Sequence, residues 1–330
     1  MSTATPDFIE NLRRTAEGGE AKAQSELGWC YHEGKEVEKD FAEALKWLRQ
    51  AAEQGEPSAQ HRIGVCYGNG EGVERDLAEA AHWFRLAAEQ GFQWSQHNLG
   101  VCYEEGHGVP RNPTEAVDWY RKAAEQGNLK AQFNLGLCYD EGKGVSQDSF
   151  EAARWFRKGA DQGNAESQND LGVCCEDGDG VPQNIDEAVG WYRKAAQQNH
   201  ALAQWNLGRC YRHGIGVLQD HVEGTRWMQK AADQGLPQAQ ASLWVAYRNG
   251  RGVPKDQQKA VDWLRKAAEN GDAHAQVCLG LEYTVGKNVP CDFAESARWM
   301  RLAAVAGYAP GQACYGHYLL TGHGTGKDPI

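Results

Sequence analysis

The stretch Ala131-Gln132-Phe133-Asn134-Leu135-Gly136-Leu137-Cys138-Tyr139 decides the fold, because its pattern returns along the chain at a fixed interval. Shifted by 36 residues, the sequence aligns with itself without a gap and yields eight complete units. A fixed period of this length is typical of repeat proteins, whose stacked units bury a shared core. One tryptophan recurs at the same place in every complete unit: Trp47, Trp83, Trp119, Trp155, Trp191, Trp227, Trp263 and Trp299.

Each unit is predicted to form two helices joined by a glycine-rich turn. In the quoted stretch, alanine, leucine and tyrosine recur three and four residues apart, which places them on one helical face. Gly142-x-Gly144 then ends the first helix, since glycine adopts the left-handed conformation that terminates helices. A second helix should begin at Asp148, whose side chain would cap it, and Glu151 would bond back to the N–H of the cap residue. Gly136, in the middle of the first helix, predicts close packing, with the Ala-Ala pair of the second helix as the expected partner.

The repeats also set the domain organisation. We expect an N-terminal capping helix in residues 1–20, eight repeats in 21–308, and a partial ninth repeat in 309–330 that caps the C-terminus. The last residues, Asp328-Pro329-Ile330, look like the start of another second helix. Either residues 309–320 cap the end alone or the natural chain continues.

The combined pattern resembles a known family. Ala-x-Ala-Gln-x-x-Leu-Gly-x-x-Tyr, then Gly-x-Gly-Val, a capping Asp, Ala-x-x-Trp and Ala-Ala, is similar to the Sel-1-like repeat, a relative of the tetratricopeptide repeat, from Ala21 to Tyr308. The resemblance implies an all-α fold, a right-handed α-solenoid of 36-residue helix-turn-helix repeats. It also implies a non-catalytic scaffold or adaptor that holds other proteins, and it leaves the partner open.

Composition disfavours several other classes of protein. Lys and Arg number 34 against 45 Asp and Glu, a net charge of −11, which argues against nucleic acid or an anionic membrane surface as partner. The apolar runs are far shorter than the roughly 20 residues that a membrane-spanning helix needs, so no membrane insertion is expected. Residues 1–8 carry neither the basic nor the apolar region of a secretion signal, although a mature form could have lost one.

The ten cysteines are predicted to be reduced. Secreted, disulfide-rich members of the family place a pair of cysteines in each unit, whereas this chain has one, which favours buried packing thiols and a cytoplasmic location. The sequence has no motif for a metal, a cofactor or a catalytic nucleophile, so none is expected and an enzyme is disfavoured. Six of the cysteines occupy one helical position: Cys30, Cys66, Cys102, Cys138, Cys174 and Cys210.

Residues that depart from the repeat are the candidate binding residues. One variable position of the first helix, which lines the concave surface in tetratricopeptide-like solenoids, forms a polar ladder of Asn98, Asn134, Asp170 and Asn206. Such a ladder could bond the backbone of an extended peptide, or it could bond within the stack. Large aromatic side chains stand nearby where the pattern has none, and they would hold side chains of the partner. They are Trp94, Phe133 and Trp205, with Trp29 and Trp244 as further departures.

Charge changes sign along the first helices. Their C-terminal ends are acidic in the third to fifth units and basic afterwards, where Arg212 and Arg248 occupy the same position. We therefore expect the groove to hold an extended segment of a protein partner, with its acidic end at the two arginines. A binding module for a small molecule or glycan is the alternative.

Overall fold

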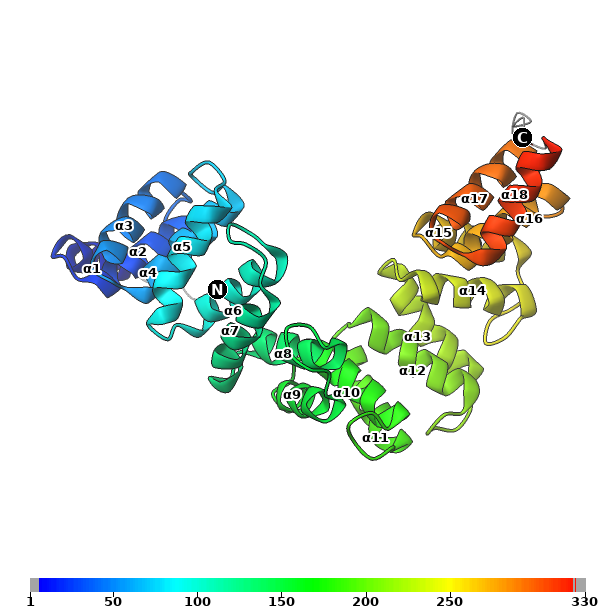
Figure 1. Ribbon diagram of the computed structural model, residues 1–330, viewed down its shortest axis with the longest axis horizontal. Helices are drawn as coiled ribbons and strands as arrows, with labels where there is room; N and C mark the ends of the chain where they lie inside the picture. Colours follow the sequence, from blue (N-terminus) through cyan, green and yellow to red (C-terminus); the bar gives the residue numbers. More distant parts are fainter. Residues whose placement is uncertain (1–5, 323, 325–330) are drawn as a thin grey trace. The chain divides into compact units, whose positions relative to one another are not determined.

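The computed structural model describes residues 6–322 and 324 of the chain, and within them all regular structure is helical, as the repeat predicts. The helix start expected at residues 328–330 lies outside the described part. The described residues form an all-α solenoid of helix pairs (Figure 1). The helices are α1 Pro6–Glu17, α2 Ala21–Glu33, α3 Phe41–Glu53, α4 Pro57–Asn69, α5 Leu77–Glu89, α6 Gln93–Glu105, α7 Pro113–Glu125, α8 Leu129–Glu141, α9 Ser149–Asp161, α10 Ala165–Asp177, α11 Ile185–Gln197, α12 Ala201–His213, α13 His221–Asp233, α14 Pro237–Asn249, α15 Gln257–Glu269, α16 Ala273–Val285, α17 Phe293–Val305 and α18 Ala309–Thr321.

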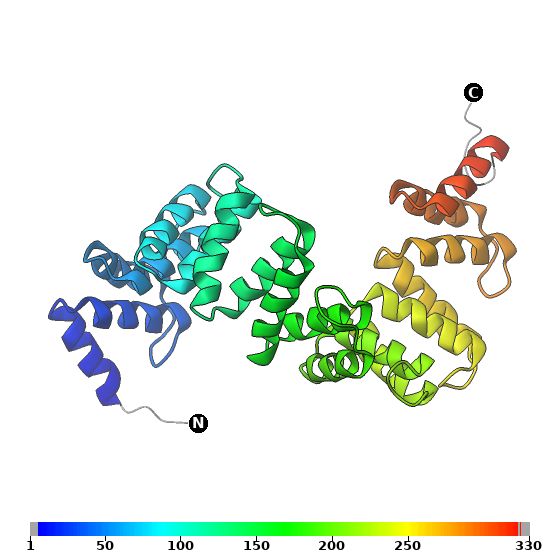
Figure 2. The ribbon, with the colours of Figure 1, turned by 60° about the horizontal axis from the view of Figure 1, so that its bottom comes forward.

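The chain divides into two compact units, with the division after Gln162. The N-terminal unit holds α1 to α9, and the C-terminal unit holds α10 to α18. Within each unit the two helices of a repeat pack most extensively on each other, and the second helix then packs on the first helix of the next repeat (Figure 2).

The close packing predicted for the mid-helix glycine is confirmed, but its expected partner was wrong. A Cβ added at Gly136 on α8 would lie 2.5 Å from Cε1 of Phe156 on α9, so only glycine leaves room for that ring. Phe156 directly follows the recurring tryptophan. The Ala-Ala pair faces the next repeat instead: Ala51 and Ala52 pack with Ile63 of α4.

The second helices are capped from one direction. Oδ1 of Asp148 accepts from the N–H of Glu151, as expected. The reciprocal bond is absent from this turn, because the N–H of Asp148 donates to the carbonyl of Tyr139 at 2.9 Å, and Glu151 pairs with Arg154 at 2.8 Å. The cap therefore ties the second helix to the recurring tyrosine of the first.

The recurring glutamine joins one repeat to the next. Nε2 of Gln96 donates to the carbonyl of Ala88 in the preceding repeat at 3.1 Å, and its Oε1 accepts from Nε2 of Gln126 at 2.7 Å. Gln132 repeats both bonds, with Ala124 and Gln162. A buried amide so placed satisfies carbonyl groups at the ends of second helices and fixes the stacking register.

Candidate functional site

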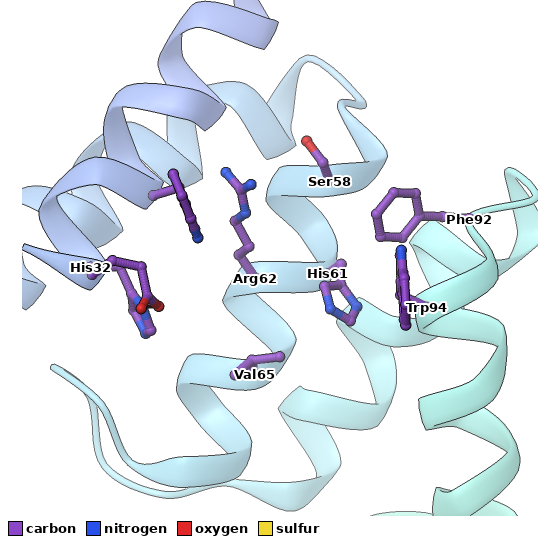
Figure 3. A pocket seen from close by; sticks show the side chains of 9 residues that line it. His32, Ser58, His61, Arg62, Val65, Phe92 and Trp94 are labelled. Atoms are coloured by element: carbon purple, nitrogen blue, oxygen red, sulfur yellow. Dashed lines mark hydrogen bonds and ion pairs between the residues drawn. The ribbon is translucent and has the colours of Figure 1, made fainter. Parts of the chain in front are cut away.

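The first helices α2, α4 and α6 of the N-terminal unit line an open cavity of about 350 Å³. Three consecutive first helices supply its walls, because the same face of each repeat turns toward the same side. Figure 3 shows His61, Arg62 and Val65 of α4 between His32 on one side and Phe92 and Trp94 on the other. The full lining is Trp29, His32, Glu33, Ser58, His61, Arg62, Val65, Phe92 and Trp94.

The polar walls of this cavity are held in place by bonds within the unit. Nη1 of Arg62 donates to the carbonyl of Ser25 at 2.6 Å, and its guanidinium lies 5.5 Å from the ring centre of Trp29. Nδ1 of His61 lies 2.9 Å from Oγ of Ser95. Burial, followed by the charge of Arg62, lowers the pKa of His61 to about 4, so this ring is neutral at physiological pH.

Trp94 is the exposed wall of the cavity. It sits in the first turn of α6, and 49% of the residue's surface is accessible. Phe92, just before the helix, packs on the ring of His61 at 5.3 Å between centroids. Because a tryptophan offers a large apolar face, its exposure next to a cavity is typical of a recognition surface rather than of a folded core.

The other predicted aromatic residues are more enclosed. Phe133 is half-buried and packs on Phe156 at 6.0 Å between ring centroids. Trp205 is half-buried too, and its Nε1 donates to Oγ of Ser242 at 3.3 Å. Trp244 is buried in the core of the C-terminal unit against α15 and α16. Its departure from the repeat is therefore explained by local repacking of that core.

The members of the polar ladder bond to neighbouring side chains. Asn98 and Asn134 both contact His97, at 3.1 Å to Nδ1 and 3.4 Å to Nε2. In the C-terminal unit, Asn169 donates to Oδ1 of Asp170 at 2.8 Å and accepts from Asn206 at 3.0 Å. Asn206 is only 8% exposed. The polar ladder therefore bonds within the stack of helices, which is one of the two alternatives that the sequence left open.

The acidic ends of the first helices have internal partners. Oε2 of Glu104 accepts from the hydroxyl of Tyr120 at 2.6 Å, and Glu176 accepts from Tyr192 at 2.8 Å and from Arg209. Burial, followed by these carboxylates, raises the pKa of both tyrosines. The helix dipole disfavours a carboxylate at the C-terminal end of a helix, and hydrogen bonds from tyrosine hydroxyls stabilise these carboxylates there.

A basic cluster lies in the C-terminal unit. We define it as Arg212 and His213 at the end of α12, His221 at the start of α13, and Arg251 in the turn after α14. Oγ1 of Thr225 donates to the carbonyl of Arg251 at 3.2 Å and so holds that turn against α13. Arg248, exposed on α14, lies one repeat after Arg212 and its guanidinium is 5.6 Å from the Trp244 ring centre.

The charges of this cluster are alike. Burial and then the nearby Arg251 lower the pKa of Arg212, which is half-buried. Burial, followed by Arg212, lowers the pKa of His213, with Arg209, His221 and Arg251 acting in the same direction. The buried Nδ1 of His221 lacks a hydrogen-bond partner within the described residues. Such an arrangement has unused capacity for an anionic group.

The sequence analysis singled out Trp94, Arg212 and Arg248 as candidates, and it did not single out His61 and Arg62, which line the cavity. Arg62 occupies the ladder position one repeat before Asn98. Its departure from the Asn pattern was therefore a signal that could have pointed to the cavity.

Comparison with known proteins identifies the repeat. The Sel1 repeat family matches residues 21–56, 57–92, 95–128, 129–164, 165–200, 201–236, 238–272 and 273–308. Proteins of this family are generally non-catalytic scaffolds that bind other proteins. No helix in the described part of the chain is both long and apolar enough to cross a membrane.

Solved structures agree with this match. A Sel1 repeat protein from Oxalobacter formigenes is 34% identical with a TM-score of 0.73, over 95% of this chain and 92% of that one. A protective antigen of uropathogenic Escherichia coli with an SLR fold is 35% identical with a TM-score of 0.64, over 97% of this chain and 84% of that one. The secretory immunoglobulin A-binding protein EsiB of Escherichia coli CFT073 is 51% identical over 39 residues, which are 12% of this chain and only 8% of that protein. The chain belongs to the Sel1 repeat family.

Proposed function

We propose that this chain is an adaptor that holds an extended segment of a partner protein against the exposed faces of its first helices. The observation that carries the proposal is Trp94, 49% exposed beside a cavity of about 350 Å³. An apolar side chain of the partner enters that cavity and covers the indole. Burying an aromatic anchor of this kind is what gives protein interfaces most of their affinity.

The cavity offers both kinds of contact that a protein segment needs. Trp29, Phe92 and Trp94 supply apolar walls, while Ser58 and Arg62 line the same cavity with polar groups. The neutral imidazole of His61 lines the floor without bringing a charge into the cavity. A few polar groups around an aromatic centre fix the direction of a bound chain.

In the C-terminal unit, we place acidic residues of a partner at Arg212 and Arg248. The support is electrostatic, because the positive charge of Arg251 repels that of Arg212 and, after burial, lowers its pKa. An incoming carboxylate would relieve this repulsion and form a charge-assisted hydrogen bond. Phe133 and Trp205, which are half-buried, would contact side chains of the partner, whereas the ladder residues keep their bonds within the stack.

Paired substitutions test this proposal. Immobilised wild-type protein captures partners from a lysate, mass spectrometry identifies them, and their affinity for each variant is then measured. Phe150→Ala is the control, because Phe150 is 66% exposed on the second helix α9, away from the cavity. We expect Trp94→Ala to weaken binding of the identified partner by about 2 kcal/mol or more, roughly 30-fold, and Phe150→Ala to leave it unchanged. Equal binding by both folded variants would refute the role of the cavity.

The arginines are tested in the same assay. Arg212→Ala should weaken capture, whereas Arg193→Ala, which removes the same charge from the exposed face of α11, should not. An equal loss in the two variants would mean that net charge, and not the basic cluster, attracts the partner.

A small molecule or glycan is the second candidate ligand, and one observation favours it. Several departures from the repeat gather around one cavity, where Trp29 and Trp94 provide aromatic faces and Ser58 and Arg62 provide hydrogen-bond donors. Screening a glycan array and a metabolite library by thermal shift, with Trp94→Ala as the control, distinguishes the two. A compound that stabilises the wild-type protein but not Trp94→Ala would favour this candidate.

The free thiols support a cytoplasmic location for this function. None of the ten cysteines, all within the described residues, forms a disulfide, and seven of them are buried. A protein that folds with buried thiols is suited to a reducing compartment.

A further inference from the structure

Three side chains with metal-binding atoms meet between the first two repeats. His32 lies at the end of α2, Cys66 lies on α4, and Glu71 lies in the turn that follows α4. Nε2 of His32 is 2.8 Å from Oε2 of Glu71, and one ligand atom from each of the three residues lies within 4.8 Å of the other two. Cys66 is fully buried, and the side chains of His32 and Glu71 are 16% and 29% exposed.

A fourth residue orients the imidazole. Oε1 of Glu33 is 2.8 Å from Nδ1 of His32, so the ring turns its Nε2 toward Glu71 and Cys66. The edge of the ring packs on Phe41 at 5.3 Å, which restricts its rotation. A carboxylate on the far nitrogen is the usual second-shell partner of a metal-binding histidine, since it fixes the tautomer and raises the basicity of the ligating nitrogen.

The repeat explains the cysteine but not its neighbours. A cysteine recurs at this position in six repeats as a packing residue. The positions that correspond to His32 and Glu71 hold Gly68 and His107 beside Cys102 in the next repeat. One repeat further they hold Glu104 and Lys143, whose charged atoms are 4.0 Å apart. The same positions therefore can form a plain ion pair, which is the competing explanation for His32 and Glu71.

We propose that His32, Cys66 and Glu71 bind a Zn²⁺ ion through Nε2, Sγ and a carboxylate oxygen. Thiolate and imidazole ligands select zinc over Mg²⁺ and Ca²⁺, which prefer oxygen. Binding releases the thiol proton to solvent and leaves the fourth tetrahedral position to water. The partly exposed side chains of His32 and Glu71 give an ion access to the site from solvent. The zinc site does not rest on the proposed function, although His32 also lines the cavity.

Cobalt titration of the full-length reduced protein tests the site. The protein is first stripped with a chelator, and Co²⁺ alone is the probe, because its thiolate complex absorbs in the near ultraviolet and Zn²⁺ displaces it. All variants are made in a Cys278→Ala background, since Sγ of Cys278 is 3.7 Å from Nε2 of His274 and could bind the ion separately. We expect one ion per chain with a thiolate band that Cys66→Ser removes.

Matched variants separate a metal site from a packing thiol. Cys102→Ser changes the equivalent cysteine of the next repeat and should keep the band, while His32→Gln and Glu71→Gln should each weaken binding at least 10-fold. Circular dichroism checks the fold of each variant; if Cys66→Ser does not fold, His32→Gln and Glu71→Gln decide. No thiolate band at micromolar Co²⁺, a band that survives Cys66→Ser, or unchanged affinity in His32→Gln and Glu71→Gln would overturn the proposal and leave an ion pair only.

Discussion

Two glycines on helix α4 should respond to the same substitution with opposite signs. A Cβ added at Gly64 would lie 2.6 Å from Cε1 and 2.7 Å from Cδ1 of Phe84, and 3.1 Å from the carbonyl oxygen of Ala80. At Gly68, one turn later, the nearest atom outside the helix is Cβ of Ala80 at 3.8 Å, an ordinary contact. The helix, the repeat and the chemical change are the same, so the neighbouring helix alone distinguishes the two sites.

The magnitudes follow from two opposing effects. Alanine in place of glycine stabilises a helix interior by about 1 kcal/mol, and this gain applies to both sites. At Gly64 the added methyl group stands about 1 Å inside the normal carbon–carbon contact distance of roughly 3.5 Å. Overpacking of a buried site costs about 1–3 kcal/mol, and Phe84 is only 7% exposed. Gly64→Ala should therefore destabilise by up to about 2 kcal/mol, while Gly68→Ala should stabilise by about 0.5–1 kcal/mol.

Urea unfolding followed by circular dichroism measures the difference between the two variants. In a Phe84→Ala background, Gly64→Ala should cost less than it does in the wild type, because the ring that the methyl group meets is gone, and the double-mutant coupling should be about 1 kcal/mol. If Gly64→Ala stabilises the protein as much as Gly68→Ala does, the recurring glycine does not serve close packing and this explanation fails.

Three further predictions address the stacking, the thiols and the buried imidazole. Gln96→Leu should destabilise by about 1–3 kcal/mol, because it removes both the buried hydrogen bond to the carbonyl of Ala88, which keeps only the N–H of Gly91, and the acceptor of Gln126; an unchanged urea midpoint would count against this role of the recurring glutamine. Intact mass under non-reducing conditions should find ten free thiols, and an intrachain disulfide among the buried cysteines would contradict both the structure and the cytoplasmic assignment. Folding lowers the pKa of His61 to about 4, so the protonated ring favours the unfolded chain. His61 therefore has no effect on the pH dependence of the free energy of unfolding above pH 6.5, and it lowers that free energy as the pH falls from 6.5 toward 4. His61→Gln should lessen that fall in the urea midpoint relative to wild type, and an identical pH profile would argue against a buried neutral ring.

The fold could be predicted from the sequence because each repeat carries its own start and stop signals. Asp148 caps a helix and Gly142, at a φ of 68°, ends one, and both signals act within a few residues. The partner of Gly136 was harder to predict. Phe156 and the Ala-Ala pair lie on the same second helix and recur with the same period, so periodicity alone cannot decide which of them faces the glycine.

The candidate site could be predicted only in part, because bonds between side chains of neighbouring repeats do not show in the sequence. Departures from the pattern identify unusual residues such as Trp94, but they do not show which polar groups have already formed bonds. Asn206 deviates from the pattern as plainly as Trp94 does, yet it is buried against Asn169. The sequence analysis did not single out the proposed zinc ligands for the same reason, because His32 and Glu71 belong to different repeats and no short motif contains both.

A single spacing explains most of these internal bonds. Asn134 reaches His97, Asn206 reaches Asn169, and the guanidinium of Arg62 reaches the carbonyl of Ser25, and each pair is 37 residues apart. The spacing is one repeat plus one residue, so the sixth residue of a first helix meets the fifth residue of the first helix before it. A polar residue at the sixth position is therefore evidence of recognition only when the residue 37 positions earlier cannot bond it. Trp94 occupies the second position, outside this register, and it is 49% exposed, which is why we propose it as the anchor for a partner.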